Sequence, residues 1–317
     1  MIIYIVFADM KFTLRQIVVF AAVARQESVS RAAEALSLSQ SATSTALAEL
    51  ERIYETPLFD RIGKRLRLNE SGQSLLPLAL DILERAEAIE DALEGRAGFG
   101  KLRIGATLTI GNYLATLIVA DYLKRHPEST AELHVHNTAT IVDQVARHEL
   151  DVGLIEGHCQ HPDIITERWV EDELVVFCAP SHPLAAKGRA SLAELVEESW
   201  IVRESGSGTR ETLDQAMRHH RFSPNVRLEL EHTEAIKRAV EHGLGIGCIS
   251  RLALREAFRR GSLVAIETPE LDLLRHFQFL WHRRKFQTAG MREFIALCRA
   301  KTAGIKRSDE IDWPYIP

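Results

Sequence analysis

The stretch Leu14–Leu68 constrains the fold of this chain most, because two stripes of apolar residues flank a short polar break in it. The break is Ser37–Ser39, and this spacing is typical of two helices that meet at an angle across a tight turn. Ala33 is small enough to let the two helices approach closely. The stripes are Phe20, Ala24, Val29, Ala32, Ala33 and Leu36 before the break, and Ala42, Ala46, Leu47, Leu50 and Ile53 after it.

The second of these helices begins with a cluster of short polar side chains. Such groups suit the base edges and phosphates of duplex DNA better than they suit an apolar core. They are Ser39, Gln40, Ser41, Thr43 and Ser44. The pattern therefore predicts a helix-turn-helix whose second helix lies on DNA.

The charge of this region supports the same interpretation. Between Lys11 and Leu68 nine Lys or Arg residues stand against six Asp or Glu, whereas the whole chain has a net charge of −5. Four of the nine lie within Phe59–Leu68, where Gly63 interrupts two short β-like runs. A basic hairpin beside such a helix is the usual phosphate clamp, although any solvated hairpin can carry basic residues. The four are Arg61, Lys64, Arg65 and Arg67.

Length and composition limit the remaining possibilities. At 317 residues the chain is long enough for one small and one larger domain. Its four cysteines lie far apart without CxxC spacing, which argues against a zinc knuckle or disulfide framework and fits a reducing cytoplasm. The apolar run Ile2–Ala8 is too short to span a bilayer and lacks the layout of a signal peptide. We therefore expect a cytoplasmic protein with no membrane partner, and residues 1–9 before Met10 are a candidate upstream extension.

A long helix is expected after the hairpin, over residues 69–94, with Asn69 as its N-cap. Apolar residues recur in it at alternating intervals of four and three, which is a heptad seam. Such a seam either packs on its own domain or joins two subunits, and we favour a dimerisation helix because no other partner is evident. The seam residues are Leu75, Ala79, Ile82, Ala86, Ile89 and Leu93. Residues 95–100, which read GRAGFG, form the expected hinge.

Beyond the hinge, over residues 101–305, strand-like and helix-like runs alternate. This alternation predicts mostly parallel sheets with helical faces. The stretches Asp172–Pro180 and Thr268–His276 look like crossings between two lobes, so we expect a bilobed α/β domain with a cleft. The tail, residues 306–317, is polar and then reads WPYIP, and we expect it to be loosely ordered.

From Lys11 to Ala300 the order of these parts resembles that of the LysR-type transcriptional regulators. The N-terminal part carries the signature of that family, with Ser41 where a proline is common and Glu55 where a glycine usually ends the recognition helix. The matching residues are Phe20, Val23, Ser28, Ala32, Ala33, Leu36, Ser39, Gln40, Ser44, Leu50, Glu51, Leu58, Phe59 and Arg61.

The resemblance implies a fold, partners and DNA contacts. The fold would be an all-α winged helix-turn-helix at residues 10–68, then the dimerisation helix, then an α/β effector domain of two Rossmann-like lobes, like a periplasmic binding protein. The partners would be double-stranded operator DNA, further copies of the chain in a homodimer or homotetramer, and, as a further candidate, RNA polymerase. The residues implied in DNA binding are Ser39, Gln40, Ser41, Thr43 and Ser44 at the major groove, Arg31 at the backbone, and Arg61, Lys64 and Arg65 at the wing.

Two segments of the second domain look suited to a small anion. In Gly105–Asn112 a strand ends and a helix begins, so hydroxyls and backbone N–H groups gather at a helix N-terminus. In Arg203–Thr212 glycines allow a nest of backbone N–H groups before another helix. For each segment alone, plain helix capping is the alternative. The candidate effector-binding residues are Thr107, Leu108, Thr109, Asn137, Thr138, Ser205, Ser207 and Thr209.

Together the two segments most resemble the branch of the family tied to sulfur assimilation and sulfite response. The branch implies a sulfur oxyanion such as sulfite or sulfate as the effector, with no other cofactor, and an organic carboxylate metabolite is the alternative. The competing interpretation is a dimeric solute-binding protein or an enzyme. We expect no catalytic residue, because the P-loop and the G-x-S-x-G elbow are missing. We also expect no metal site, because the pairs His134/His136 and His158/His161 lack a third ligand.

Overall fold

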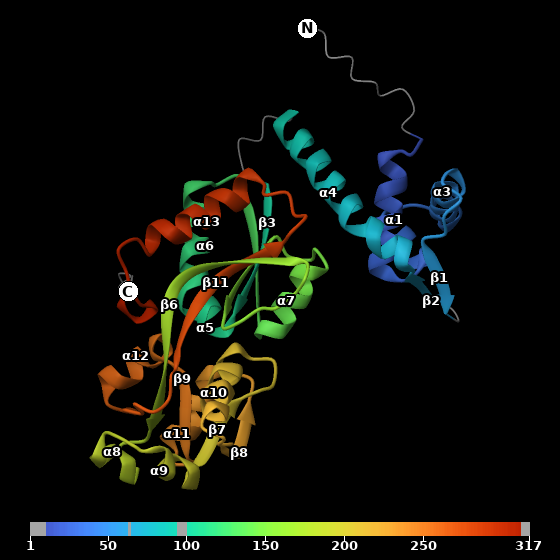
Figure 1. Cartoon of the computed structure of the whole chain (residues 1–317). Coiled ribbons are helices and arrows are strands. Elements are labelled where there is room, and N and C mark those ends of the chain that lie inside the picture. Colours follow the sequence, from blue (N-terminus) through green and yellow to red (C-terminus); the bar gives the residue numbers. More distant parts are fainter. Residues whose placement is uncertain (1–10, 63–64, 94–99, 312–317) are drawn as a thin grey trace. The chain divides into compact units, whose positions relative to one another are not determined.

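The computed structural model of the chain describes residues 11–62, 65–93 and 100–311. The chain divides into two compact units, Met1–Arg96 and Ala97–Pro317 (Figure 1).

Three short helices form the first part of the N-terminal unit, and a hydroxyl group caps each of them. Thr13 and Gln16 form a capping box, and Ser28 and Ser39 accept hydrogen bonds from backbone N–H groups in the first turns of the next two helices. Phe20, Ala32 and Leu50, from the predicted stripes, are buried in one core. The helices are α1 (Leu14–Gln26), α2 (Val29–Ala35) and α3 (Gln40–Ile53). The predicted helix-turn-helix is thus confirmed.

A two-stranded antiparallel hairpin follows, with β1 (Phe59–Ile62) paired to β2 (Arg65–Leu68). It is the wing that the basic cluster predicts, and Gly63 and Lys64 between its strands lie outside the described residues. Between α3 and the wing, Glu55 has a φ of 49°. This left-handed conformation explains why glycine is usual there, since a residue with a Cβ adopts it at an energetic cost.

The long helix α4 (Glu70–Leu93) matches the expected helix, but only part of its heptad seam is available to a partner. Ala79 is buried in the core of the N-terminal unit, and Leu75 packs against that core. Ile89 and Leu93, near the C-terminal end, are exposed. The helix therefore packs on its own unit through its first half, and the dimerisation role of the second half stays a prediction.

The second unit contains one large sheet that runs through both lobes, in the strand order β4-β3-β5-β11-β6-β9-β7-β8, with β10 paired to β6. The first three strands are parallel to one another, as are the last three, whereas β6 and β11 run antiparallel to their neighbours. The strands are β3 (Lys101–Thr107), β4 (Thr130–His136), β5 (Val152–Glu156), β6 (Ile164–Cys178), β7 (Ser199–Arg203), β8 (Asn225–Leu230), β9 (Ile246–Ser250), β10 (Val264–Ile266) and β11 (Leu274–His282).

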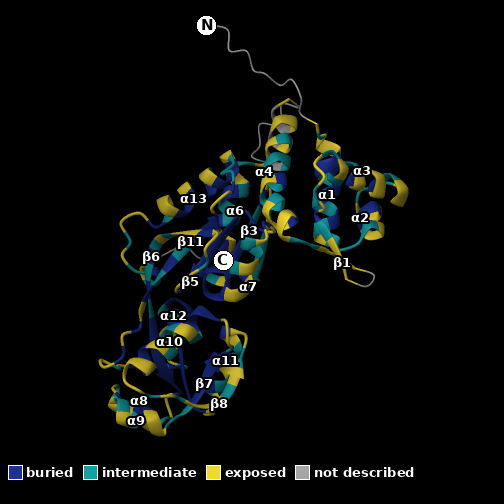
Figure 2. Cartoon of the chain, turned by 45° about the vertical axis from the view of Figure 1, so that its right-hand side comes forward, coloured by how far each residue is buried: buried dark blue, intermediate teal, exposed yellow. Residues whose placement is uncertain are grey.

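The long strands β6 and β11 connect the two lobes. β6 pairs with β11 from Ile164 to Glu173 and with β9 from Leu174 onward, so the crossing lies close to the predicted stretches. Figure 2 shows the buried strands of each lobe between helices whose outer faces are exposed. The bilobed α/β fold is confirmed. The helices are α5 (Leu108–Ile110), the π-helical turn η1 (Gly111–Ala115), α6 (Thr116–Arg125), α7 (Thr138–Ala146), α8 (Pro183–Lys187), α9 (Leu192–Glu197), α10 (Gly208–His219), α11 (Thr233–Glu241), α12 (Arg251–Arg260) and α13 (Ala289–Lys301).

The expectation of a loose tail from residue 306 is wrong for its first half. The segment contains a 3-10 turn, η2 (Ser308–Glu310), and Ile311 is buried in the core of the first lobe. Buried partners explain the order: Ser308 hydrogen-bonds to Asp172, and Arg255 donates to the carbonyl of Ile311. A polar sequence misleads here because its polar groups are satisfied by other buried polar groups.

Candidate functional site

The N-terminal turn of α3 presents most of the polar residues that the sequence singles out for DNA. Gln40 and Ser44 are exposed one turn apart, so they share a face of the helix. Ser39 and Ser41 are exposed too, with 3.1 Å between their hydroxyl oxygens, and Ser39 also accepts a hydrogen bond from the amide of Ala42. Ser39 thus caps the helix while its neighbours remain available to a partner.

Thr43 corrects the predicted set. Its side chain is 0% exposed, and its hydroxyl donates to the carbonyl oxygen of Ser39 over 3.1 Å. Thr43 lies four residues before the buried Leu47 and seven before Leu50, so it belongs to the core face of α3. It supports the helix and does not face the groove of DNA.

The wing separates its arginines onto two faces. In an antiparallel pair, directly opposed residues point to the same side, and Arg61 is opposite Leu66, which packs against the core. Arg65 and Arg67 are two residues apart and share the other face, opposite Ile62 and Asp60. Arg67, which the predicted set leaves out, therefore accompanies Arg65 more closely than Arg61 does.

Of the two remaining predicted DNA contacts, the structure describes Arg31 but not Lys64. Arg31 is exposed on α2, and its guanidinium donates to the carbonyl of Gln26 over 2.5 Å, which holds the side chain beside the end of α1. Lys64 lies outside the described residues.

In the second unit, several candidate effector residues converge at the carboxyl ends of the parallel strands. Thr107 ends β3, Thr138 begins α7, and Thr209 lies in the first turn of α10 in the other lobe. All three are buried. The carboxyl ends of strands are where open α/β sheets hold their ligands, so this grouping agrees with the expected place of the site.

A buried trio of charged side chains, which sequence reasoning missed, lies among these threonines. Arg275 of β11 is 5% exposed, and its Nε donates to Asp172 of β6 over 2.7 Å. Its Nη1 donates to the Thr209 hydroxyl over 3.1 Å, and its Nη2 lies 3.7 Å from Glu156 Oε1 without a hydrogen-bond partner. Thr107 donates its hydroxyl hydrogen to the other oxygen of Glu156. One cation thus lies between two carboxylates at the junction of the lobes.

The two lobes touch each other at this place. The Thr138 hydroxyl accepts a hydrogen bond from the amide of Gly208 over 3.1 Å, and the amide of Ala139 donates to the carbonyl of Gly206 over 3.1 Å. A Cβ on Gly208 would lie 2.1 Å from the carbonyl oxygen of Glu156, so only glycine permits this approach. The lobes are therefore in contact through Thr138, one of the predicted residues, and through the backbone beside it.

The other candidates have different surroundings. The Asn137 side chain caps α7 by accepting a hydrogen bond from the amide of Thr140, which is the capping alternative. Leu108, Thr109 and Ser207 are buried near the same strand and helix ends, whereas Ser205 is exposed.

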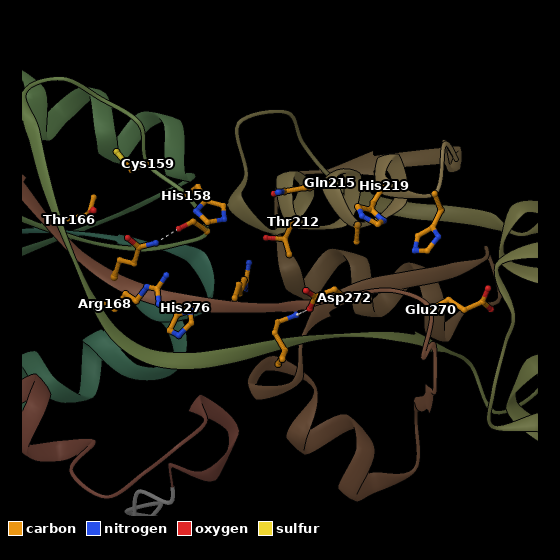
Figure 3. A pocket seen from close by; sticks show the side chains of 16 residues that line it. His158, Cys159, Thr166, Arg168, Thr212, Gln215, His219, Glu270, Asp272 and His276 are labelled. Carbon is orange, nitrogen blue, oxygen red and sulfur yellow. Dashed lines mark hydrogen bonds between the residues drawn. The ribbon is translucent and has the colours of Figure 1, made fainter.

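A groove of about 770 Å³ opens beside the buried trio, and Arg275 is among its lining residues. Figure 3 shows Arg168, His158 and His276 toward one end and Glu270 toward the other, with Thr212 and Gln215 of α10 between them. One end of the groove therefore holds a guanidinium and two imidazoles, and the other holds the carboxylate of Glu270 beside the imidazole of His219. Burial raises the pKa of the Cys159 thiol in its wall, which keeps that group protonated.

Two properties of the described residues bear on other classes of function. Within residues 11–62, 65–93 and 100–311, no cluster of three or more His, Cys, Asp or Glu side chains is placed to hold a metal ion. None of the described helices combines the length and apolar character needed to cross a bilayer.

Comparison with known proteins gives the same division of the chain. Residues 14–73 match the bacterial regulatory helix-turn-helix proteins of the lysR family, and residues 96–303 match the LysR substrate binding domain. The Escherichia coli K12 protein YeiE, an uncharacterized HTH-type transcriptional regulator, is 43% identical over 91% of this chain and 98% of its own length. The Bacillus subtilis regulator CysL is 28% identical over 89% of this chain and 95% of its own length.

Solved structures agree on the fold. The regulatory domain of Synechocystis CcmR, solved in complex with 2-PG, is 26% identical with a TM-score of 0.61 and covers 65% of this chain and 99% of that one. A full-length OxyR variant from Pseudomonas aeruginosa has a TM-score of 0.70 at 21% identity and covers 92% of this chain and 95% of that one. The chain therefore belongs to the LysR family: it is a DNA-binding transcriptional regulator with an effector-binding domain, and not an enzyme.

Proposed function

We propose that the chain binds operator DNA as a homodimer or homotetramer, through α3 and the wing, and that a small oxyanion bound between the lobes controls this binding. The exposed polar face of α3 supports the contact with DNA. The exposed apolar residues Ile89 and Leu93 of α4 support the association of subunits. CbnR, which shares the fold, was solved in complex with its target DNA. Control requires that the anion prefer one arrangement of the lobes, typically by about 1–3 kcal/mol.

The observation that carries the anion proposal is the guanidinium of Arg275. It is buried, and its Nη2 has no hydrogen-bond partner among the described residues. A buried donor without a partner costs free energy, which an oxyanion would recover with a charge-assisted hydrogen bond. The hydroxyls of Thr107 and Thr209 lie against the same charged trio and could turn toward such a ligand.

Glu156 favours sulfite over sulfate as the sulfur oxyanion. Its buried carboxylate can only accept hydrogen bonds, so it suits an anion that carries a proton and repels one that carries none. Near neutral pH part of sulfite is protonated, whereas sulfate is not. We therefore propose hydrogensulfite as the favoured form of the ligand, with its proton directed at Glu156 and an oxygen at Arg275.

An organic carboxylate or phosphate is the second candidate, and the groove supports it. A volume of about 770 Å³ exceeds what one inorganic oxyanion fills, and Arg168 lies toward the end opposite Glu270. CcmR, with a regulatory domain of the same fold, was solved in complex with 2-PG. In this alternative an organic anion would extend from Arg275 along the groove toward Arg168.

A thermal-shift panel on the full-length chain tests the proposal. The ligands are sulfite, sulfate, thiosulfate, phosphate, O-acetylserine and dicarboxylates, in buffers of equal chloride. A ligand present at 100 times its Kd stabilises a fold by about 2.7 kcal/mol, which gives a measurable rise in Tm. We expect the largest rise with sulfite, and no rise in Arg275→Gln. A folded wild-type chain that ignores every ligand of the panel contradicts the proposal.

Two variants distinguish the sulfite proposal from the organic-anion alternative. Glu156→Gln can donate a hydrogen bond as well as accept one, so it should gain a response to sulfate. Arg168→Gln serves as the matched control, because it changes a cation that lies in the groove and outside the buried trio. It should leave the sulfite response intact. Loss of an organic-acid response in Arg168→Gln, with no sulfite response in the wild type, would establish the second candidate instead.

A further inference from the structure

The C-terminal segment 306–311 contacts strand β6, which crosses between the lobes, and helix α12 of the second lobe. The Arg307 guanidinium lies 3.0 Å from Glu173 of β6, and Arg251 of α12 lies 2.8 Å from the same carboxylate. Arg255, also of α12, donates to the carbonyl of Ile311 over 2.6 Å. We name residues 306–311 the C-terminal strap. Ile311 adds an apolar anchor in the core of the first lobe.

The centre of the strap reaches the charged trio of the ligand site. Ser308 is 0% exposed, and its hydroxyl donates to Asp172 Oδ1 over 2.6 Å. Asp172 is also 0% exposed, and its other oxygen accepts the hydrogen bond from Arg275 Nε. Asp172 and Arg275 are direct cross-strand partners of β6 and β11, so their side chains project from the same face of the pair.

We propose that the strap positions Arg275 in the ligand site, with Ser308 as the positioning residue that acts through Asp172. The inference rests on the proposed function, since it assigns Arg275 to the anion. Asp172 Oδ1 has two hydroxyl donors, Ser308 and Ser250, each at 2.6 Å, and these fix the plane of the carboxylate. That plane determines where Oδ2 holds Arg275 Nε, and thus where Nη2 points.

The strap also makes the position of the Arg275 guanidinium depend on the arrangement of the lobes. Asp172 lies one residue before Glu173, at the point where β6 leaves β11 and continues along β9 of the second lobe. Ser250, the other donor to Asp172, ends β9. A change in the angle between the lobes therefore changes the hydrogen bonds that hold Asp172. Loss of the strap should alter the ligand site although the strap itself does not contact the ligand.

The test compares Ser308→Ala with Ile311→Val in the full-length chain, with sulfite as the probe. Ser308→Ala removes one donor from a buried carboxylate, and we expect the Kd for sulfite to rise about five- to tenfold. Ile311→Val removes a buried methylene from the same strap but leaves the hydrogen bond to Asp172. It should lower Tm and leave the Kd unchanged. An unchanged Kd in a folded Ser308→Ala chain overturns the inference.

A second comparison shows whether Ser308 acts through Arg275. In Arg275→Lys the cation remains but the Nε contact with Asp172 is lost, so adding Ser308→Ala should cause no further change in Kd. An additive effect would mean that Ser308 acts by another route and would refute the positioning role.

If the proposed function is wrong, the binding measurements give a different result from the one expected for a failure of the strap. If the wild-type chain binds no anion of the panel, the effector proposal fails, and amide hydrogen exchange then tests the strap alone. Ser308→Ala should speed exchange in residues 274–278 of β11 relative to Ile311→Val. Equal exchange rates in the two variants would overturn the strap as a positioning device.

Discussion

At the scale of single residues, His148 makes stability depend on pH. Its ring contacts that of His282 at an interplanar angle of 43°, with 4.0 Å between centroids, and it is buried near Arg103, Lys285 and Arg284. Burial, and after it the electrostatic effect of His282 and then of the three cations, lowers the pKa of His148 from 6.5 to about 3. Asp151 supplies the negative charge of this cluster, but it is engaged by Arg103 and Lys285. His148 therefore stays neutral in the folded chain.

The sign of the pH effect follows from which state binds the proton. Between pH 6.5 and about pH 3 the unfolded chain protonates His148 and the folded chain does not, so stability falls as the pH falls. From this residue we expect a loss of about 2 kcal/mol between pH 6.5 and pH 5, measured by urea unfolding. His148→Asn, which tolerates the local φ of 57°, should flatten this dependence. An equally steep dependence in the variant would show that other groups cause it.

Single residues also show how far sequence reasoning reaches. Strand ends followed by helix starts correctly bring Thr107, Thr138 and Thr209 together, because the carboxyl ends of parallel strands share one edge. Glu156 and Arg275 escape such reasoning, since opposite charges far apart in the sequence become a buried pair only when β5 and β11 are neighbours. The prediction for Thr43 is wrong, although its spacing to Leu47 and Leu50 is the signal of a core position.

At the scale of elements, the two faces of the wing predict unequal roles for its arginines in DNA binding. Arg65 and Arg67 share the solvent face of the hairpin, whereas Arg61 lies on the face of Leu66. Arg65→Ala and Arg67→Ala should each weaken binding to all DNA sequences alike and lower the salt slope by about one. Arg61→Ala should have a smaller effect on that slope.

The measurement is a fluorescence anisotropy titration against specific and random duplexes at several salt concentrations. Arg52→Ala is the control, because Arg52 is exposed at the end of α3 and paired with Glu49. Equal salt slopes for the three wing variants would contradict the division into faces. Gln40→Ala, by contrast, should relax the preference for the specific duplex.

Elements differ in how strongly their sequence indicates them. The buried strands β5 and β9 are predicted within one residue of their observed bounds, whereas β6 (Ile164–Cys178) is predicted only from Leu174 onward. The strand β7 (Ser199–Arg203) is missed, because five residues after a short helix carry little periodic signal. The strap reads as a loose tail because its order comes from Asp172, Glu173 and Arg255, which lie far away in the sequence. Contacts with residues that are distant in the sequence leave no local sequence pattern from which the order of the strap could be predicted.

At the scale of the whole effector domain, two of the hydrogen-bonded contacts between the lobes differ in their relation to the ligand site. One is the contact of Thr138 with Gly208 at the ligand site. The other joins Tyr113 of η1 to α11, where its hydroxyl donates to Glu234 over 2.5 Å and accepts from Lys237 over 3.3 Å. Lys237 is itself buried and lies 2.6 Å from Glu234. Burial, and after it the hydrogen bond to Glu234, raises the pKa of Tyr113, so its hydroxyl keeps the proton that it donates.

These two contacts make different contributions to ligand binding. The Thr138 contact must adjust when an anion enters, because its atoms border the site, whereas the Tyr113 contact lies on η1 and α11 and can persist. Tyr113→Phe removes only the hydroxyl, so it should destabilise the observed arrangement, in which the lobes are in contact and which we call closed, by about 1 kcal/mol while the ring keeps its packing. The free protein would then populate open arrangements more, and a ligand that requires the closed one would bind more weakly by the same free energy.

Small-angle scattering of the ligand-free chain should therefore show a larger radius of gyration for Tyr113→Phe than for the wild type, and saturating ligand should remove the difference. Tyr122→Phe is the matched control, because Tyr122 is buried within the first lobe and packs on Phe294 of that lobe. It should lower Tm without changing the radius. If Tyr113→Phe changes neither the radius nor the affinity, the Tyr113 contact does not control the arrangement of the lobes, and effector control would then reside in the ligand site itself.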